Sequence, residues 1–482
     1  MNPASALRSE ADVASILADF ERRNDAFGMT ADGISLWRML RFEISFILQD
    51  LGLHRSSVPV DELIASLFGA LSQLALAPRD LEFLGATMTS ALRKFDERGW
   101  HDIYFDPVID QISGGAKMLY ADARGFNQNE KHAYRKPVFS DTSVVAVSAA
   151  LGRLFPARPD RNFQRLSELI VADLKLTQFS AERIRLKFSV LRWRARLYRL
   201  VLQRLRPRCL LVPNSGQFAL FLAANSLGIP FIEMQHGIFS NEHPDNLSSD
   251  VLTCDRQTLM LPDLLTVYGS YWMKILEHSA LGRLGRIRAV GSPMIDVNRG
   301  LRQRSFVADP GKPVLTLTSQ GIAAGRLADF VAEFLRLCPS QFELNIRLHP
   351  GYEAEATHYD AKFSEDPRVV LWRGNSKPDT YEMIATSDLH LSISSACHFE
   401  ALGIGTPTAI VALPSHELVL GLAERGDAIL IHSPQELADL VLSRGWGVVP
   451  AQTSHYYFQP EHVANLRAVL NECTSLRRGR VQ

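Results

Sequence analysis

The chain lacks the features that mark several common classes of protein. Its 482 residues include only five cysteines, which are scattered and form no CxxC pair, so neither a disulfide framework nor a zinc ribbon is supported. No apolar run reaches the ~20 residues that a membrane-spanning helix needs. The segment Met1–Ala6 has no signal-peptide pattern. We therefore expect a cytoplasmic protein that contacts membranes only peripherally.

There is also no excess of charge of either sign. The 52 basic residues are matched by 52 acidic residues, so the composition suggests no nucleic-acid partner. Hydrophobic residues make up 46% of the chain and charged residues 22%, as in ordinary globular proteins. A chain of this length has room for about two to four domains.

Motifs of the best-known nucleotide-binding enzymes are missing as well. There is no Walker A sequence and no GxGxxG between a strand and a helix, which removes support for an ATPase or a dehydrogenase. No paired-aspartate motif stands out, since Asp379 and Asp388 are isolated. Helix dipoles, arginine and histidine can neutralise a phosphate, so we expect a site that uses no metal ion and no cofactor.

The pattern of apolar residues changes along the chain. Residues 1–100 are predicted to be a helical block, because apolar residues recur at helical spacing, first around Ala14–Phe20 and again between 60 and 98. Short apolar runs between turn residues then indicate strands at Ile103–Asp106 and Ser143–Val147. Further on, strands alternate with helices, which predicts parallel sheets covered on both faces.

We therefore predict an α/β protein with two doubly wound, Rossmann-like domains. The first domain covers 101–245 together with the helical block 1–100. A polar linker leads to the second domain at 262–450, and a C-terminal helix and tail follow at 451–482. The carboxyl ends of parallel strands bind ligands, so the cleft between the two domains is the predicted site.

Two histidines at strand ends are the strongest indication of chemistry. His236 follows the apolar run Phe231–Gln235, and Gly237 lets a ligand approach the backbone closely. His349 follows the run Leu344–Leu348. Histidine can act as a general base because its ordinary pKa lies near neutrality. The alternative for each is a structural hydrogen bond within its loop.

The region around His349 is also suited to a phosphate. Pro350 breaks the chain sharply after it, and Arg347 should lie on the same face two residues earlier. Imidazole and guanidinium groups both bind phosphate oxygens. Ser319 and Gln320 follow another predicted strand, so their amides and polar side chains would face the same cleft.

A third element joins a strand directly to a helix through two serines. Ser394 and Ser395 precede the first turn of this helix, whose free N–H groups form an anion site. Glu400 lies about one turn into the helix and is placed to bind a ribose. The structural alternative is that Ser395 only caps the helix.

A long helix predicted between Glu182 and Arg206 carries many arginines. The basic residues from Arg183 to Arg208 could face anionic lipid or an anionic glycan. The alternative is a solvated basic face on a helix that packs against the core. The first interpretation predicts peripheral contact with the inner face of the cytoplasmic membrane.

Three segments resemble GT-B glycosyltransferases of bacterial surface-polysaccharide synthesis. They are Gly228–Gly237, Arg347–Pro350, and the serine pair with Glu400. The pattern is similar above all to CDP-glycerol glycerophosphotransferases and to bacterial sialyl-, polysialyl- and Kdo-transferases. These families have a catalytic residue at the end of an N-domain strand, and an HP motif and a serine pair that bind a cytidine nucleotide.

Carried over by position, the resemblance implies a role for each matching residue. His236 would be the acceptor-activating base, and Glu233, Gln235 and Gly237 would lie on the acceptor side. The remaining residues would bind the donor, namely Ser319, Gln320, Arg347, His349, Pro350, Ser394, Ser395 and Glu400. The sialyltransferases have two acidic residues before the glycine, so Gln-His-Gly in this chain is nearer to the Trp-His-Gly of the teichoic-acid enzymes.

The resemblance covers roughly residues 205 to 435, and residues 1 to 200 match no such motif. It implies an inverting glycosyltransferase that needs no metal and moves a sugar from a CMP- or CDP-linked donor to a surface glycan or glycolipid. A sialic-acid-like or Kdo sugar is the expected transferred group. Three alternatives stay open: a CDP-glycerol-type transferase, a nucleotide-sugar 2-epimerase, and a non-catalytic polysaccharide assembly protein.

Overall fold

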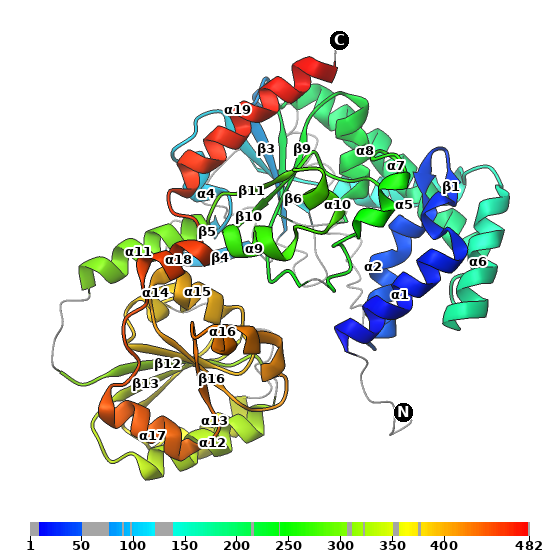
Figure 1. Ribbon diagram of the computed structural model, residues 1–482. Helices are drawn as coiled ribbons and strands as arrows, with labels where there is room; N and C mark the ends of the chain where they lie inside the picture. The colour runs from blue at the N-terminus through cyan, green and yellow to red at the C-terminus, as the bar shows by residue number, and fades with distance from the viewer. Residues whose placement is uncertain are drawn as a thin grey trace.

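Two parallel sheets with helices on both sides form the two halves of the molecule (Figure 1). The computed structural model describes residues 9–50, 77–88, 91–96, 99–120, 138–213, 216–240, 242–305, 311–321, 323–349, 356–374 and 377–480. The predicted pair of Rossmann-like domains is confirmed.

The first sheet has seven parallel strands in the order β11-β10-β9-β8-β3-β6-β7. Chain order reverses between β3 and β8, and such a reversal opens a crevice at the carboxyl ends of the strands. The strands are β3 (Phe83–Met88), β6 (Gly115–Tyr120), β7 (Val138–Ser140), β8 (Leu210–Val212), β9 (Phe231–Met234), β10 (Leu264–Val267) and β11 (Ile287–Ala289).

The second sheet has six parallel strands in the order β14-β13-β12-β15-β16-β17. Numbered along the chain, this is the 3-2-1-4-5-6 order of the Rossmann fold, with its reversal between β12 and β15. The strands are β12 (Val314–Thr318), β13 (Glu343–Arg347), β14 (Val369–Trp372), β15 (Leu389–Ser392), β16 (Thr408–Val411) and β17 (Ile429–Ile431).

Helices cover both faces of each sheet because neighbouring residues on a strand point to opposite sides. On β8, Leu210 packs in the cluster with α7 and α8, whereas Leu211 packs in the cluster with α4 and α19. The helices of the first half are α1 (Glu10–Asn24), α2 (Leu36–Leu48), α4 (Asp106–Ile109), α5 (Thr142–Leu154), α6 (Arg161–Leu174), α7 (Ala181–Leu205), α8 (Phe218–Ser226), α9 (Ser270–Ile275) and α10 (Ala280–Arg283).

The other described helices belong to the second half, except α19, which packs against the first sheet. Most of them alternate with the strands of that half, as predicted. They are α11 (Pro293–Ser305), α12 (Ala324–Leu337), α13 (Ala356–Phe363), α14 (Thr380–Ala385), α15 (Cys397–Ile404), α16 (Leu420–Glu424), α17 (Pro434–Ser443), α18 (Ala451–Tyr457) and α19 (His462–Arg480). In the described parts of the chain, no helix has the length and hydropathy needed to cross a bilayer.

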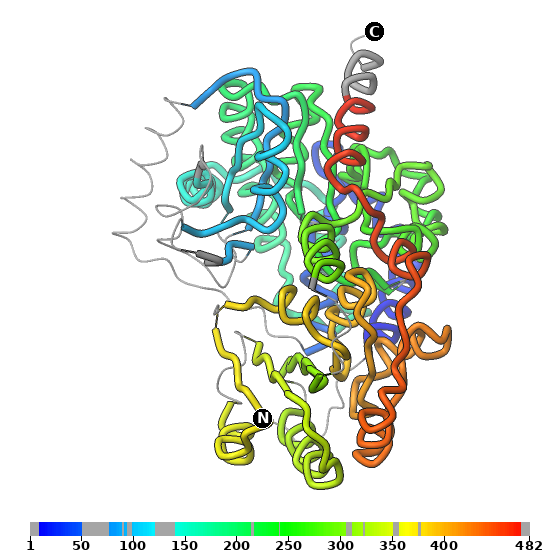
Figure 2. The backbone as a smooth tube through the Cα atoms, turned by 90° about the vertical axis from the view of Figure 1, so that its left-hand side faces the viewer, coloured from blue at the N-terminus to red at the C-terminus, as the bar shows by residue number. Residues whose placement is uncertain are grey.

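The end of the chain ties the two halves together. α19 runs from the second half back to the first sheet, as both views show (Figures 1 and 2), and Leu466 and Leu470 join the core that contains Phe83 and Ile232. A second shared core forms where Trp272 of α9 packs against Phe399 of α15, with ring centroids 5.0 Å apart. The two domains therefore meet across an apolar interface.

The N-terminal helices form a separate layer on the first domain. α1 begins with a capping box, in which Ser9 and Asp12 satisfy each other's backbone N–H groups. Phe20 of α1 packs on Trp37 of α2 with ring centroids 4.5 Å apart. The same core includes Phe163 of α6, which lies far along the chain. The short strands β1 (Thr30–Ala31) and β2 (Ile34–Ser35) join α1 to α2.

Several sequence predictions about element type were wrong. Ser143–Val147 lies in helix α5, and Ile103–Asp106 is a turn that leads into α4. Within the block 1–100 that was predicted to be helical, the structure places β3, β4 (Leu92–Asp96) and part of β5 (Gly99–Asp102). Residues 51–76 of that block lie outside the described residues. Short apolar runs do not separate strand from helix, because both types of element bury such residues.

The predicted boundary between the domains at 262 was also wrong. β10 pairs with β9 and β11 pairs with β10, so the first sheet extends through Ala289. The second sheet begins only with β12. Strands and helices alternate without interruption across this region, and alternation does not reveal which sheet a strand joins. Two extra strands therefore belong to the first domain.

Candidate active site

A pocket of about 200 Å³ lies between the two domains. Its first wall contains His236 and Gly237, which follow β9, and Tyr104, which follows β5. Its second wall contains Tyr381 of α14 and Glu400 of α15. The predicted interdomain site is thus a real cavity, with candidate residues on both sides.

The loop that carries His236 is held by the side chain before it. The Gln235 amide donates from Nε2 to the carbonyl oxygen of Gly237 at 2.8 Å. Its Oε1 accepts a hydrogen bond from the Tyr268 backbone at 2.9 Å. The Tyr104 hydroxyl donates to the His236 carbonyl at 3.4 Å. Gln235 was predicted to lie on the acceptor side, but both polar atoms of its side chain bind backbone groups of the protein.

The environment of His236 keeps its imidazole neutral. Burial and, to a smaller extent, the neighbouring His243 lower the pKa of His236 to about 4, against an opposing effect of Asp245. Its Nδ1 is buried and has no hydrogen-bond partner among the residues that the structure describes. A neutral imidazole is the form that can accept a proton.

Glu233 does not face this pocket. It lies against a second, small cavity with Arg38 and Asp245, on the side of the first domain that contacts the N-terminal helices. Burial and, to a smaller extent, the charge of Asp245 raise the pKa of Glu233 to about 8, against an opposing effect of Arg38. A carboxyl group in this state is mainly protonated at neutral pH. The expected acceptor-side role of Glu233 has no support from its position.

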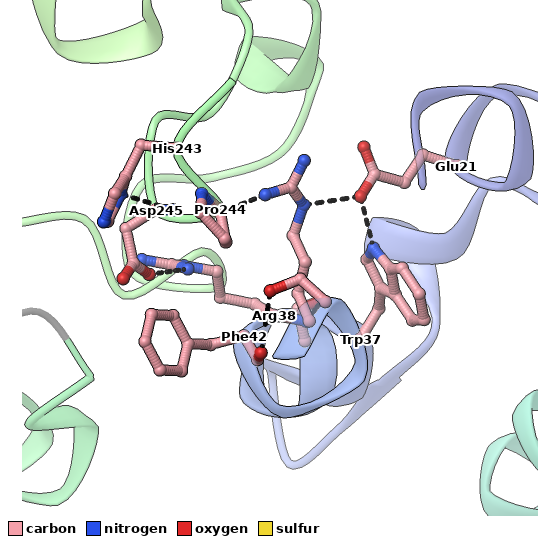
Figure 3. A network of polar contacts seen from close by, with 10 residues as sticks. Glu21, Trp37, Arg38, Phe42, His243, Pro244 and Asp245 are labelled. Atoms are coloured by element: carbon pink, nitrogen blue, oxygen red, sulfur yellow. Dashed lines mark hydrogen bonds and ion pairs between the residues drawn. The ribbon is translucent and has the colours of Figure 1, made fainter. Parts of the chain in front are cut away.

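A network of polar contacts joins the N-terminal helices to the loop after His236 (Figure 3). Arg38 of α2 pairs with Asp245, with Nη1 and Oδ1 2.8 Å apart. Arg41 donates to the carbonyl of Pro244 and, through Nε, to Glu21 at 2.6 Å. Trp37 donates to the same Glu21 oxygen at 2.8 Å. The helical block is therefore attached directly to the loop that begins at the candidate base.

On the second domain, the predicted residues gather at the reversal point of the sheet. β12 and β15 are paired neighbours, which brings the turns after them together. Ser394 donates to the side-chain oxygen of Gln320 at 3.2 Å. Ser319 lies 3.0 Å from the Tyr359 hydroxyl. Ser395 accepts from the backbone N–H of Cys397 at 3.2 Å, while the N-cap position of α15 is taken by Ala396, which makes no side-chain capping bond.

Glu400 and the end of β13 have different surroundings. Tyr381 donates to Glu400 Oε1 at 3.1 Å, and burial raises the pKa of Glu400. Arg347 is buried and donates to the Gly374 carbonyl at 2.7 Å, whereas His349 is exposed. The structure therefore does not bring Arg347 and His349 into the pocket of His236. Pro350 lies outside the described residues.

Comparison with known proteins adds similarity of fold. No family model and no curated protein sequence matches the chain. The UDP-GlcNAc 2-epimerase of Neisseria meningitidis is 15% identical, with a TM-score of 0.42, covering 81% of this chain and 98% of that one. MurG of Acinetobacter baumannii is 12% identical, with a TM-score of 0.45, covering 82% and 100%. The wall teichoic acid polymerase TagF is 11% identical, with a TM-score of 0.46, covering 88% and 100%.

Sequence analysis missed several residues of the pocket. Arg93 and the tyrosines 104, 268 and 381 line it, although none stands in a recognisable motif. Arg93 lies on β4, in a segment that was predicted to be helical. Isolated tyrosines carry no signal of their own in a single sequence.

A buried histidine pair behind the serines was missed as well. His390 contacts Thr318 Oγ1 through Nε2 at 2.9 Å and Thr408 Oγ1 through Nδ1 at 2.8 Å. His398 contacts the same threonine oxygen at 2.7 Å. Burial lowers the pKa of both, to about 3 for His398, so as neutral hydrogen-bonding groups they link β12, β15, β16 and α15. Both histidines were visible in the sequence, but only the strand pairing brings them together. Among the described residues there is no group of three or more His, Cys, Asp or Glu suited to a metal ion.

Proposed function

We propose that the chain is an inverting glycosyltransferase that moves a sugar, such as a sialic-acid-like or Kdo sugar, from a CMP- or CDP-linked donor to a surface glycan or glycolipid. One observation carries the proposal. His236 from the first domain and Glu400 from the second line the same interdomain pocket. A donor bound to one domain and an acceptor bound to the other would meet there, which is the arrangement that direct transfer needs.

The proposed mechanism is a single displacement. The neutral His236 takes the proton of the acceptor hydroxyl as the hydroxyl oxygen attacks the donor. The bond from the transferred group to the nucleotide phosphate breaks, and the phosphate leaves with the bonding electrons. The N-terminus of α15 with Ser394 and Ser395 stabilises its negative charge, together with Gln320 and Ser319. Inversion at the reacting carbon follows from one displacement.

The remaining donor residues keep subordinate roles in this proposal. Glu400, held by Tyr381, binds the ribose. His349, which is exposed and lies outside the pocket of His236, is proposed to contact the donor phosphate when the nucleotide is bound. Arg347 supports that strand end through its bond to Gly374. We propose no metal ion and no cofactor in the reaction.

The test begins with a thermal-shift screen of CMP, CDP, UDP and GDP. A nucleotide present at 100 times its Kd stabilises the folded protein by about 2.7 kcal/mol. The proposal expects stabilisation by the cytidine nucleotides alone. A preference for UDP or GDP would reject the cytidine assignment. Transfer assays of His236→Ala and His349→Ala with the matching donors then test the mechanism.

The other candidate reactions separate in the same assays. Epimerised nucleotide sugar formed without any acceptor would identify a 2-epimerase. Transfer of glycerol phosphate from CDP-glycerol would identify a polyol-phosphate transferase. Binding of glycans without donor turnover would leave a non-catalytic assembly protein.

The predicted membrane contact depends on which basic residues of α7 are still available. Many already bind acidic residues of the same domain. The pairs are Arg183 and Lys187 with Glu43, Arg192 with Asp32, Arg206 with Asp80, and Arg208 with Glu82. Arg183, Lys187 and Arg192 belong to α7, and Arg206 and Arg208 follow its end, so the pairing of these cations favours the structural interpretation of the basic segment.

A smaller exposed surface of α7 is still available for contact with a membrane. Arg196 lies over the Trp193 ring at 4.5 Å, and Leu200 is 63% exposed one turn further along. Phe155, at the end of α5, is also exposed and contacts Trp193. We propose that this mixed face carries any contact with anionic lipid. Co-sedimentation with phosphatidylglycerol vesicles should fall in Leu200→Asp, and equal binding by the variant would reject this face.

A further inference from the structure

The segment that follows His236 is anchored at both ends. At the pocket, Gln235 binds the Gly237 carbonyl and fixes the first turn. At the other end, Pro244 and Asp245 are both bound by arginines of α2. Figure 3 shows the second of these ends, where His243, Pro244 and Asp245 lie beside the N-terminal helices. The position of His236 therefore depends on contacts that lie outside the pocket.

Arg38 is an unusual residue to find at such a contact. Its side chain is 3% exposed and that of Asp245 is 4% exposed. The guanidinium also lies over the Phe218 ring at 4.8 Å. Burying an ion pair is costly, and an apolar pair of similar size is often equally stable. Such a pair is better explained by the geometry that it specifies than by the stability that it adds.

Arg41 supplies a second, independent anchor. It lies three residues after Arg38, so both arginines project from the same face of α2. Its guanidinium binds the Pro244 carbonyl, and Glu21 of α1 holds it in place at 2.6 Å. The planar guanidinium can bind a carboxylate and a backbone carbonyl at once, which a lysine cannot do in the same geometry. Two adjacent loop residues are thus fixed by two neighbouring side chains.

The anchored residues also act on the candidate base electrostatically. The charges of Asp245 and His243 both influence the pKa of His236, so these groups lie within electrostatic reach of it. Arg38 in turn compensates the charge of Asp245. A displacement of this loop would therefore change both the orientation of His236 and the charges near it.

We propose that helices α1 and α2 are part of the catalytic apparatus, and that Arg38 and Arg41 are positioning residues for His236. The block thereby has a role in the reaction that its sequence did not suggest. This inference rests on the proposed function of His236 as the base.

The test compares Arg38→Met with Arg38→Lys in the transfer assay. For Arg38→Met we expect kcat to fall at least tenfold, while the donor KM and the thermal shift by the cytidine nucleotide change less than twofold. Arg38→Lys should recover part of kcat, because it keeps a positive charge opposite Asp245. Unchanged kcat in folded Arg38→Met would overturn the inference.

A second variant separates positioning from stability. The double substitution Arg38→Met with Asp245→Leu removes both charges and should recover the stability lost in Arg38→Met, but not kcat. If kcat recovers together with stability, the arginine acts only through folding and the inference is wrong. Arg256 offers a matched control, since it forms a 2.8 Å pair with the buried Asp263 elsewhere in the first domain. Arg256→Met should lose stability and keep kcat.

The outcomes also distinguish this inference from the proposed function. If the wild-type protein transfers nothing from any cytidine donor, the proposed function fails. If the wild type is active and Arg38→Met retains its kcat, only the role of the helical block fails.

Discussion

Substitution of the buried Lys117 should destabilise the wall of the pocket. Its ammonium pairs with Asp106, and the two side chains are 1% and 3% exposed. The second Asp106 oxygen accepts from the Asp102 backbone at 2.7 Å. Asp102 in turn accepts from the backbone of Tyr104 at 2.8 Å and of Phe105 at 3.0 Å. This chain of contacts fixes the turn that carries Tyr104 into the pocket.

Lys117→Met keeps an unbranched side chain that is one heavy atom shorter and removes the charge, so two buried carboxyl groups lose their cation. Removing one partner of a buried ion pair costs about 3–5 kcal/mol, because the other charge is left uncompensated. Burial already raises the pKa of Asp102 to about 6 from 3.8, and Lys117 is the main group that lowers it. We expect the loss in the free energy of unfolding to reach this size at pH 8.

The same loss should be smaller at pH 5. A carboxyl group whose pKa is raised by folding contributes stability below its unfolded pKa, and that contribution disappears as pH rises through its folded pKa. For Asp102 the window runs from 3.8 to about 6 in the wild type, and it extends upward once Lys117 is gone. Protonation at pH 5 therefore relieves the variant more than the wild type.

Urea unfolding of the wild type and Lys117→Met at pH 5 and pH 8 measures both effects. Arg206→Met is the control, since Arg206 and Asp80 form a 2.7 Å pair with side chains 55% and 68% exposed. An exposed pair contributes about 0–1 kcal/mol. A loss below about 1 kcal/mol in Lys117→Met, or an equal loss at both pH values, would refute the reasoning.

Three further predictions concern other parts of the structure. Between pH 4.5 and about 8, Glu233 is protonated in the folded protein and ionised in the unfolded chain, so the free energy of unfolding falls as the pH rises. Glu233→Gln should make this fall smaller. Urea unfolding that gives the same dependence of stability on pH for variant and wild type would contradict this. Gly269→Ala should cost about 1–3 kcal/mol, since the added Cβ would lie 2.5 Å from the Tyr457 carbonyl oxygen, and an unchanged Tm would contradict the packing of α18. Ser394→Ala should raise the donor KM roughly fivefold through the loss of about 1 kcal/mol of hydrogen bonding, and an unchanged KM would remove Ser394 from the donor site.

Much of the second domain was predictable from the sequence. Its strands are short segments in which apolar residues recur, and the predicted alternation of strands with helices is present from Val314 to Val411. A parallel strand that is buried on both faces needs many apolar residues, which makes such segments visible in a sequence. Ser394 and Gln320 could be predicted for the same reason, since each ends such a strand.

The first domain was harder to predict because its contacts are long-range. The core of the helical block joins Trp37 to Phe163, and its polar contacts join Arg38 to Asp245. None of these pairs leaves a mark within a local window of sequence. Knowing the direction of β9 was not enough to predict the position of the Glu233 side chain. Glu233 lies on the strand that leads to the pocket, but its side chain faces a different cavity. Which residues meet in the first domain depends on how its helices and strands pair, and this pairing cannot be seen in the sequence.

The single-turnover rate of transfer in His236→Asn tests the central claim most directly. A general base contributes typically about 10²–10⁴-fold to a rate. With a donor whose nucleotide stabilises wild type and variant equally, the variant should transfer slower by a factor in this range. A folded variant with intact nucleotide binding and a rate close to that of the wild type would show that the pocket between the domains does not use His236 as its base.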